Sequence, residues 1–231
     1  MTPPGVPPEP APGAEGVFSV PLGAASGPAE PVPRRLIGQR LAAPALSFAP
    51  DLLLAAQGGS LGVKAAIFDV DGVLTDGRIY IGEHGEGVKA FNTLDGHGLK
   101  LLKQGGITPL VITGRDSPAV RRRVADLGLA HAVYGAADKL AAAMHLLAAL
   151  GLDWSQVAAI GDDWPDLPLL ERAAFACAPA NAHIEVKARA DHVTAAHGGH
   201  GAAREFCDLL LMANGQYARL LHGHLQTLDG T

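Results

Sequence analysis

Short apolar segments alternate with helix-like segments from residue 63 onward, and this alternation constrains the fold more than any other feature. The predicted strands are residues 64–69, 107–112, 131–134, 157–160, 174–177 and 192–194. The predicted helices between them are residues 95–104, 117–127, 138–150, 166–173, 182–189 and 201–213. Such alternation is typical of a parallel sheet covered by helices on both faces. We therefore predict an α/β fold with a doubly wound parallel sheet.

One segment interrupts the alternation. Residues 77–92, GRIYIGEHGEGVKAFN, read as a strand, a Gly-rich turn and a second strand. Two apolar runs joined by such a turn predict a β-hairpin. We therefore expect a small hairpin inserted between the first strand and the first helix of the sheet domain.

The two ends of the chain differ from its centre. Residues 1–48 are rich in Pro, Ala and Gly, and this composition predicts a disordered extension. Residues 49–62 are predicted to form a short helix and a linker, and residues 63–215 the folded domain. Residues 216–231 remain as a C-terminal tail.

Composition excludes several classes of function. The formal net charge of −5 gives no reason to expect nucleic acid or an anionic membrane as a partner. Cys177 and Cys207 are the two cysteines of the sequence, too few for a disulfide framework, so a cytoplasmic location is expected. No apolar run reaches the roughly 20 residues that span a bilayer.

Polar residues follow four of the predicted strands. Asp69 and Asp71 follow the first, Thr113 the second, Lys139 the third, and Asp162, Asp163 and Asp166 the fourth. Ligands bind beyond the carboxyl ends of strands in open α/β sheets, so these side chains are expected to meet there. Clustered carboxylates resist joint ionisation without a cation, and oxygen ligands suit Mg²⁺. The hydroxyl of Thr113 and the ammonium of Lys139 suit a phosphoryl group.

This set of groups predicts phosphoryl chemistry. One carboxylate can attack phosphorus and form an aspartyl-phosphate, and a second can protonate the leaving alkoxide and then activate water. Metal and lysine would stabilise the charge on the phosphoryl oxygens.

The four motifs, in this order, resemble those of the haloacid dehalogenase superfamily of phosphatases. The resemblance implies that Asp69 is the nucleophile and Asp71 the acid and base, with Thr113 and Lys139 as the other catalytic residues. It also implies that Mg²⁺ is bound by Asp69, the backbone carbonyl of Asp71, and Asp162, with Asp163 and Asp166 supporting them.

A finer resemblance covers about residues 60 to 215. The segments FDVDGVLTDGRIYIG, KAFNTLDGHGLK, VITGR, GDDWPDLP and ADHVTAAHGGHGAARE are similar to the 3-deoxy-D-manno-octulosonate 8-phosphate phosphatase family. This resemblance implies no large cap domain, a homotetramer associating through its hairpins, and a role in lipopolysaccharide core biosynthesis. The implied contacts to a sugar-acid phosphate are Asp71, Asn92, Thr93, Leu94, Asp95, Gly96, Lys100, Arg115, Arg123 and Lys139.

The sequence departs from the family at one position, and it leaves alternatives open. The family's Gly-Gly-Arg-Gly signature here has His200 in place of the arginine. A phosphatase of a nine-carbon sugar acid 9-phosphate shares fold and motifs, so the substrate strip 92–100 and the C-terminal tail must decide between them. The overall match of the segments favours the eight-carbon substrate. A receiver-type signalling module also phosphorylates an aspartate but has no counterpart of Asp71. A non-catalytic scaffold is disfavoured because every motif position is kept.

Simpler interpretations remain for individual residues. Asp163 and Asp166 could be ordinary acids at a helix start. Arg121 and Arg122 are expected on a solvated helix face. The spacing of His183, His192, His197 and His200 fits no common zinc site.

Overall fold

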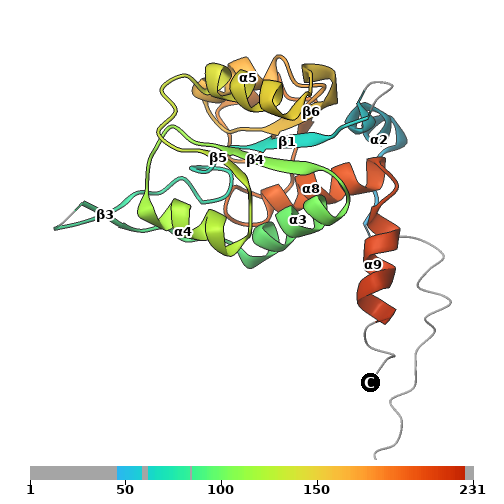
Figure 1. Ribbon diagram of the computed structural model, residues 1–231, viewed down its shortest axis with the longest axis horizontal. Coiled ribbons are helices and arrows are strands. Elements are labelled where there is room, and N and C mark those ends of the chain that lie inside the picture. The colour runs from blue at the N-terminus through green and yellow to red at the C-terminus, as the bar shows by residue number, and fades with distance from the viewer. Residues whose placement is uncertain (1–45, 59–61, 84, 227–231) are drawn as a thin grey trace, which may run out of the picture. The chain divides into compact units, whose positions relative to one another are not determined.

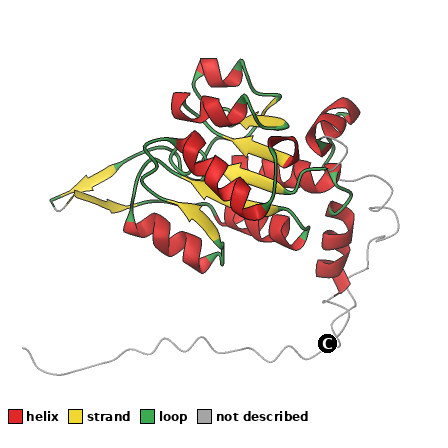
Figure 2. Cartoon of the chain, turned by 45° about the horizontal axis from the view of Figure 1, so that its top comes forward, coloured by secondary structure: helices red, strands yellow, loops and turns green. Residues whose placement is uncertain are grey.

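The computed structural model describes residues 46–58, 62–83 and 85–226. The predicted disordered extension therefore lies almost entirely outside the described residues. Within them, a parallel sheet forms the centre of the fold (Figure 2). It has six strands in the order β5-β4-β1-β6-β7-β8. Its strands are β1 (Ala65–Phe68), β4 (Thr108–Ile112), β5 (His131–Val133), β6 (Val157–Ile160), β7 (Phe175–Ala178) and β8 (His192–Val193). The predicted parallel sheet is confirmed, and each strand end lies within one residue of its predicted position.

The strand order sets the position of any ligand site. From β1 the chain adds β4 and then β5 on one side, and then returns to add β6, β7 and β8 on the other. β1 pairs with β4 and with β6, so the order reverses at β1. Ligands bind at such a switch point, outside the carboxyl ends of the strands. The residues that follow β1 are therefore the first place to look for function.

Helices cover both faces of the sheet (Figure 1). One face is covered by α2 (Pro50–Gln57), α3 (Thr93–Gln104), α4 (Pro118–Asp126) and α8 (Ala202–Ala213). The other is covered by α5 (Lys139–Leu150), α6 (Leu167–Leu170) and α7 (Ile184–Lys187). Within β1, Ala66 and Phe68 join the first hydrophobic cluster and Ala65 and Ile67 the second, because successive strand side chains point to opposite faces.

Two helices are shorter than predicted. The predicted helix 166–173 is a 3-10 turn, Trp164–Asp166, followed by the single turn of α6. The predicted helix 182–189 contains only α7. A second 3-10 turn, Trp154–Gln156, precedes β6. Pro165 and Pro168 lack the backbone N–H that helical hydrogen bonds require, which favours a 3-10 turn and a single α-helical turn over one long helix between residues 164 and 173.

The predicted hairpin is confirmed. Strands β2 (Tyr80–Gly82) and β3 (Gly85–Val88) pair antiparallel in a sheet of their own. The hairpin extends away from the main sheet (Figure 1), and its large apolar side chains Tyr80, Ile81 and Val88 are exposed. Only this hairpin and α3 are inserted between β1 and β4, so no large cap domain is present there.

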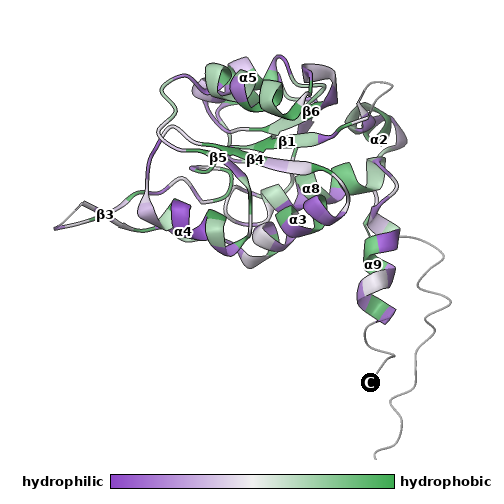
Figure 3. Cartoon of the chain, viewed as in Figure 1, coloured by the Kyte–Doolittle hydropathy of each residue, from purple (hydrophilic) through white to green (hydrophobic). Residues whose placement is uncertain are grey.

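The C-terminal segment differs from the prediction. Residues 216–231 were expected to be a tail, but α9 (Tyr217–Gln226) is helical. Apolar residues at Tyr217, Leu220, Leu221 and Leu225 recur at helical spacing, a signal that marks an amphipathic helix. Figure 3 shows the resulting mixture of hydrophobic and hydrophilic residues along α9. Tyr217 and Leu220 pack against the first hydrophobic cluster. Among the residues described, no helix has the length and apolarity needed to cross a membrane.

Candidate active site

The predicted catalytic residues meet at the carboxyl end of the sheet. Asp69 directly follows β1, Thr113 directly follows β4, and Lys139 is the first residue of α5. Asp162 follows β6 after Gly161. These residues line one cleft of about 780 Å³, together with Asp71, Arg115, Asp163 and Asp166. The structure therefore brings together every residue predicted to be catalytic or to bind the metal.

Lys139 connects two of the buried carboxylates. Its Nζ lies 2.7 Å from Asp69 Oδ1 and 2.7 Å from Asp166 Oδ1. All three residues are buried, with Asp69 6% and Lys139 8% exposed. The second oxygen of Asp166 accepts hydrogen bonds from the backbone N–H groups of Asp162 and Asp163, at 3.1 and 3.3 Å. Asp166 thus uses both oxygens to hold other parts of the site, and the predicted supporting role of Asp166 agrees with this geometry.

The carboxylates of Asp69, Asp162 and Asp166 lie close enough to share one cation. One oxygen from each lies within 4.8 Å of the others. Burial raises the pKa of Asp162 to about 8, and the charges of Asp69 and Asp166 add to the shift. Burial also raises the pKa of Asp69 to about 6, with a further contribution from the charge of Asp166, and Lys139 opposes the shift. Three carboxylates beside one ammonium leave two negative charges, which a divalent cation would neutralise.

Glycine at position 72 permits the approach of Asp162. Gly72 has φ of +97°, and a Cβ atom there would lie 2.0 Å from Asp162 Oδ2. A side chain would therefore strain the backbone and displace a carboxylate of the site.

Thr113 is buried, and its hydroxyl oxygen accepts a hydrogen bond from the backbone N–H of Arg115 at 3.3 Å. Its proton can still be donated into the cleft.

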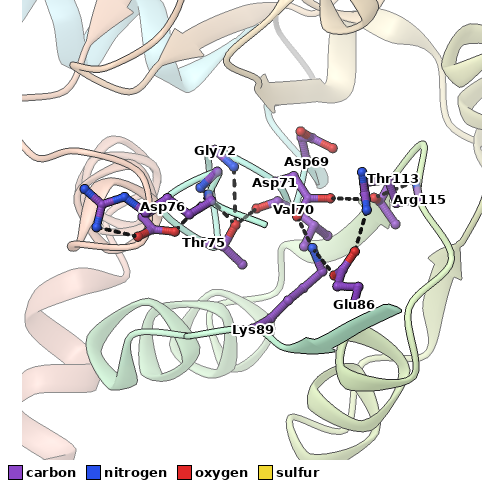
Figure 4. Close-up of polar contacts among 12 residues, drawn as sticks. Asp69, Val70, Asp71, Gly72, Thr75, Asp76, Glu86, Lys89, Thr113 and Arg115 are labelled. Carbon is purple, nitrogen blue, oxygen red and sulfur yellow. Dashed lines mark hydrogen bonds and ion pairs between the residues drawn. The ribbon is translucent and has the colours of Figure 1, made fainter. Parts of the chain in front are cut away.

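Two cleft residues, Asp71 and Arg115, belong to an ion-pair network that was not predicted from the sequence. Lys89 hydrogen bonds to Asp71 Oδ1, and its Nζ lies 2.8 Å from Glu86 Oε1. Arg115 Nη2 lies 2.5 Å from Glu86 Oε2 (Figure 4). The i, i+3 spacing of Glu86 and Lys89 was visible in the sequence. Nothing in the sequence, however, indicated that this end of the hairpin turns toward Asp71.

Several predicted substrate contacts lie outside the cleft of the same chain. Asn92 caps α3, because its Oδ1 accepts from the N–H of Leu94 at 2.8 Å. Asp95 is buried and accepts from the N–H groups of Gly201 and Arg204, so its carboxylate holds the start of α8. Arg123 donates to the Asn92 carbonyl at 3.2 Å. The other predicted contacts away from the cleft are Thr93, Leu94, Gly96 and Lys100.

Asp163, predicted to support the metal site, caps the turn that follows it. Its side chain is exposed and accepts a hydrogen bond from the N–H of Trp164 at 2.8 Å, which makes it the cap of the 3-10 turn. The carboxylate lines the cleft, but its hydrogen bond serves local structure. The simpler interpretation, an acid at a helix start, describes this contact better than support of a metal ligand does.

The Gly198-Gly199-His200-Gly201 segment packs on the loop that follows Asp71. The N–H of Gly199 donates to the Val73 carbonyl at 2.9 Å, and a Cβ at Gly198 would lie 1.7 Å from the carbonyl oxygen of Gly72. His200 itself is exposed. Close backbone contact at Gly198, which a side chain would prevent, therefore fixes the segment against the catalytic loop.

Gly198→Ala is expected to destabilise the protein by about 2 kcal/mol or more, because the loop after Asp71 must move to admit a methyl group. Urea unfolding of the variant measures this loss. Gly87→Ala is the matched control, since a Cβ at Gly87 meets nothing within 4 Å. Equal stability of both variants would contradict the packing described for the Gly198 segment.

Comparisons with known proteins agree with this geometry. Residues 133–206 match the model of a haloacid dehalogenase-like hydrolase family. The chain is 45% identical over 154 residues to the 3-deoxy-D-manno-octulosonate 8-phosphate phosphatase KdsC of Escherichia coli, a match that covers 67% of this chain and 82% of the relative. The chain belongs to the 3-deoxy-D-manno-octulosonate 8-phosphate phosphatase family. It is therefore a member of a hydrolase family, and the receiver-module and scaffold alternatives are set aside.

Solved structures of this family share the fold. The enzyme of the same name from Yersinia pestis is 40% identical, with a TM-score of 0.70 over 74% of this chain and 90% of that one. The enzyme from Moraxella catarrhalis is 38% identical, with a TM-score of 0.72 over 77% of this chain and 99% of that one. The Moraxella structure is a complex with magnesium, phosphate and the sugar acid KDO.

Proposed function

We propose that this phosphatase-family chain is a Mg²⁺-dependent phosphomonoesterase that hydrolyses 3-deoxy-D-manno-octulosonate 8-phosphate. The observation that carries the proposal is the contact of Lys139 with Asp69 at the strand end, beside Asp162. Membership of the family and the magnesium and phosphate in the Moraxella relative support it. We place this activity in the cytoplasm, in lipopolysaccharide core biosynthesis.

Three groups would hold the metal: the carboxylates of Asp69 and Asp162 and the backbone carbonyl of Asp71. These oxygen ligands fit Mg²⁺. The clustered carboxylates of Asp69, Asp162 and Asp166 carry two negative charges that Lys139 does not neutralise, and a divalent ion fits this charge. When bound, the ion would neutralise charge on the phosphoryl group and on the nucleophile. Asp166 would support this site through its bonds to Lys139 and to the N–H of Asp162.

In the first step, an oxygen of Asp69 attacks phosphorus and the bond from phosphorus to the sugar oxygen breaks. Asp71 donates its proton to the leaving alkoxide, so the sugar acid leaves as an alcohol. Lys139 and Thr113 hold the phosphoryl oxygens by donating hydrogen bonds to them. The buried Oδ2 of Asp71 has no hydrogen-bond partner among the residues described, which makes it the oxygen free to carry this proton.

In the second step, Asp71 takes a proton from water, and the water oxygen attacks phosphorus. The bond between phosphorus and Asp69 breaks, which regenerates the carboxylate and releases phosphate. The same lysine and hydroxyl hold the phosphoryl oxygens in both steps. Each step therefore uses Asp71 in the opposite sense, first as acid and then as base.

Substrate selection is assigned to cations at the cleft mouth. Arg115 lines the cleft with its side chain 45% exposed, so it can reach the sugar carboxylate. The predicted contacts at Asn92 to Gly96, Lys100 and Arg123 lie outside the cleft of their own chain, so we propose that they act in the assembled protein.

Phosphate release with Mg²⁺ tests the substrate. The comparison uses 3-deoxy-D-manno-octulosonate 8-phosphate, a nine-carbon sugar acid 9-phosphate and p-nitrophenyl phosphate. A kcat/KM at least about tenfold higher for the eight-carbon acid, a difference of about 1.4 kcal/mol, supports the proposal. Equal or reversed preference would assign the chain to another sugar-acid phosphate, and His200 would then be the first position to exchange.

We propose a homo-oligomer, as a tetramer, associated through the hairpins. The exposed Ile81, 78% accessible, and its neighbours Tyr80 and Val88 give the hairpin an apolar surface suited to such contact. Ile81→Glu is expected to reduce the mass in solution to that of a monomer, as measured by light scattering. Leu54→Glu, on α2, is the matched control because Leu54 is exposed outside the hairpin. An unchanged mass for Ile81→Glu would contradict hairpin association.

Added Mg²⁺ is expected to raise the thermal midpoint by several degrees, and more at pH 8.5 than at pH 5.5. The pKa of Asp162, about 8, and that of Asp69, about 6, lie above the usual aspartate value of 3.8. Their contribution to metal-free stability is therefore present at low pH and is lost as pH rises through these values. The ion replaces the protons, so its stabilisation grows over the same range. A midpoint shift that is equal at both pH values would contradict this account.

A further inference from the structure

The hairpin contacts two cleft residues, Asp71 and Arg115, through Lys89 and Glu86, to which the proposed mechanism gives no role. The side chain of Lys89 is 1% exposed, whereas its neighbours Val88 and Ala90 are exposed. It hydrogen bonds to Asp71 Oδ1, and its ammonium also lies 2.8 Å from Glu86. Glu86 in turn pairs with Arg115 at 2.5 Å. One chain of ion pairs therefore joins the hairpin to Asp71 and to the cation at the cleft mouth (Figure 4).

The network contains two acids, Asp71 and Glu86, and two cations, Lys89 and Arg115, so its charges balance. Burial acts to lower the pKa of Lys89, but its contacts with the acids Asp71 and Glu86 together outweigh this and raise it. The cationic side chains of Lys89 and Arg115, which pair with Glu86, lower its pKa. Removing one partner of a buried ion pair leaves the other charge uncompensated. Loss of Lys89 would therefore free Asp71 to turn and bring two carboxylates together without the cation between them.

The contact distinguishes the two oxygens of Asp71. Lys89 occupies Oδ1, whereas Oδ2 is buried without a hydrogen-bond partner among the described residues and lies 3.9 Å from Arg115 Nε. For a carboxyl group to transfer a proton, the oxygen that carries the proton must point toward the atom that receives it. We propose that Lys89 and Glu86 are positioning residues: Lys89 fixes Asp71 so that Oδ2 faces the leaving oxygen, and Glu86 holds Lys89 and Arg115 in place.

The inference rests on the proposed acid and base role of Asp71, and it predicts a dependence on the leaving group. An alkoxide needs a proton to leave, whereas p-nitrophenolate does not. Since kcat/KM reports the steps up to loss of the leaving group, a misplaced acid should lower it for alkyl phosphates only. A substitution that disturbed the cleft as a whole would instead lower kcat/KM for alkyl phosphates and for p-nitrophenyl phosphate.

The test compares three substrates: the eight-carbon sugar-acid phosphate, a primary alkyl phosphate without a carboxylate, and p-nitrophenyl phosphate. For Lys89→Met, kcat/KM should fall about 100-fold for both alkyl phosphates and less than about fivefold for p-nitrophenyl phosphate. Glu86→Gln should show the same pattern more weakly, and Lys89→Arg should restore most of the alkyl rate. The matched control is Glu83→Gln, an exposed carboxylate in the turn of the same hairpin.

Two further readouts separate positioning from damage. The midpoint shift with Mg²⁺ and the mass in solution should be unchanged in Lys89→Met, since the buried carboxylates and the apolar hairpin surface are untouched. The inference would be overturned if kcat/KM of Lys89→Met fell equally for all three substrates, fell for the sugar acid alone, or did not fall. In each of these cases the activity of the wild-type protein would still support the proposed function. A wild-type protein that hydrolyses none of the three would overturn both.

Discussion

Asp69→Asn is expected to lower phosphate release at least about a thousandfold, below reliable detection for a slow alkyl phosphate. The amide cannot form the acyl-phosphate, and it is a weaker ligand for the metal. Asp69 is 6% exposed and its Oδ1 lies 2.7 Å from Lys139 Nζ, so no neighbouring carboxylate can take its place without rearranging that contact. Phosphate release at saturating substrate measures the loss.

The fold of this variant should persist, and this separates chemistry from stability. Burial and Asp166 raise the pKa of Asp69, which means that its charge is unfavourable in the metal-free protein. A neutral amide removes that charge while Lys139 keeps its contact with Asp166. The metal-free thermal midpoint at pH 8 should therefore be equal to or above that of the wild type. Residual activity above a few per cent would contradict the assignment of the nucleophile.

Asp162→Asn is expected to remove most of the Mg²⁺ response and to lower kcat about a hundredfold or more. Its carboxylate lies with those of Asp69 and Asp166, and burial together with these charges raises its pKa to about 8. The amide cannot supply the negative charge that the ion requires. The measurement is the thermal midpoint with and without Mg²⁺ at pH 8, followed by the metal dependence of phosphate release.

The neighbouring residue provides the control. Asp163→Asn changes an exposed carboxylate whose hydrogen bond caps the turn at Trp164. Asparagine caps helices as well as aspartate does, so stability and Mg²⁺ response should stay near those of the wild type. A variant at Asp163 that lost the Mg²⁺ response as fully as Asp162→Asn would show that Asp163, not Asp162, holds the ion.

The parallel sheet could be predicted because its signal is local. The strands at the centre of the sheet are short apolar runs, and polar residues follow β1 and β4 directly and β6 after Gly161. This pattern identifies both the strands and the position of Asp69, Thr113 and Asp162 at their ends. The helix α9 was missed although its apolar spacing is regular, because the segment lies beyond the last recognised motif. The predicted helix 166–173 was too long, because Pro165 and Pro168 each stand in the first turn of a short helical segment, where their missing N–H groups are tolerated.

The ion-pair network could not be predicted, because it depends on distances between segments far apart in the sequence. On the hairpin, Glu86 lies 29 residues before its partner Arg115. Lys89 lies 18 residues after its partner Asp71. No pattern within the hairpin says which of its charged residues is buried. The hydrogen bonds of Asp95 could not be predicted for the same reason, since its partners Gly201 and Arg204 lie more than 100 residues away. Such contacts follow from packing of the whole domain.

Trapping the covalent intermediate tests the central claim most directly. The wild-type protein is mixed with Mg²⁺ and 3-deoxy-D-manno-octulosonate 8-phosphate, quenched during turnover, and reduced with borohydride, which converts an aspartyl-phosphate to homoserine. The account predicts homoserine at position 69 in the peptide map, absent without substrate and absent in Asp69→Asn. Continued turnover with position 69 unmodified, or with the modification at Asp162, would contradict it.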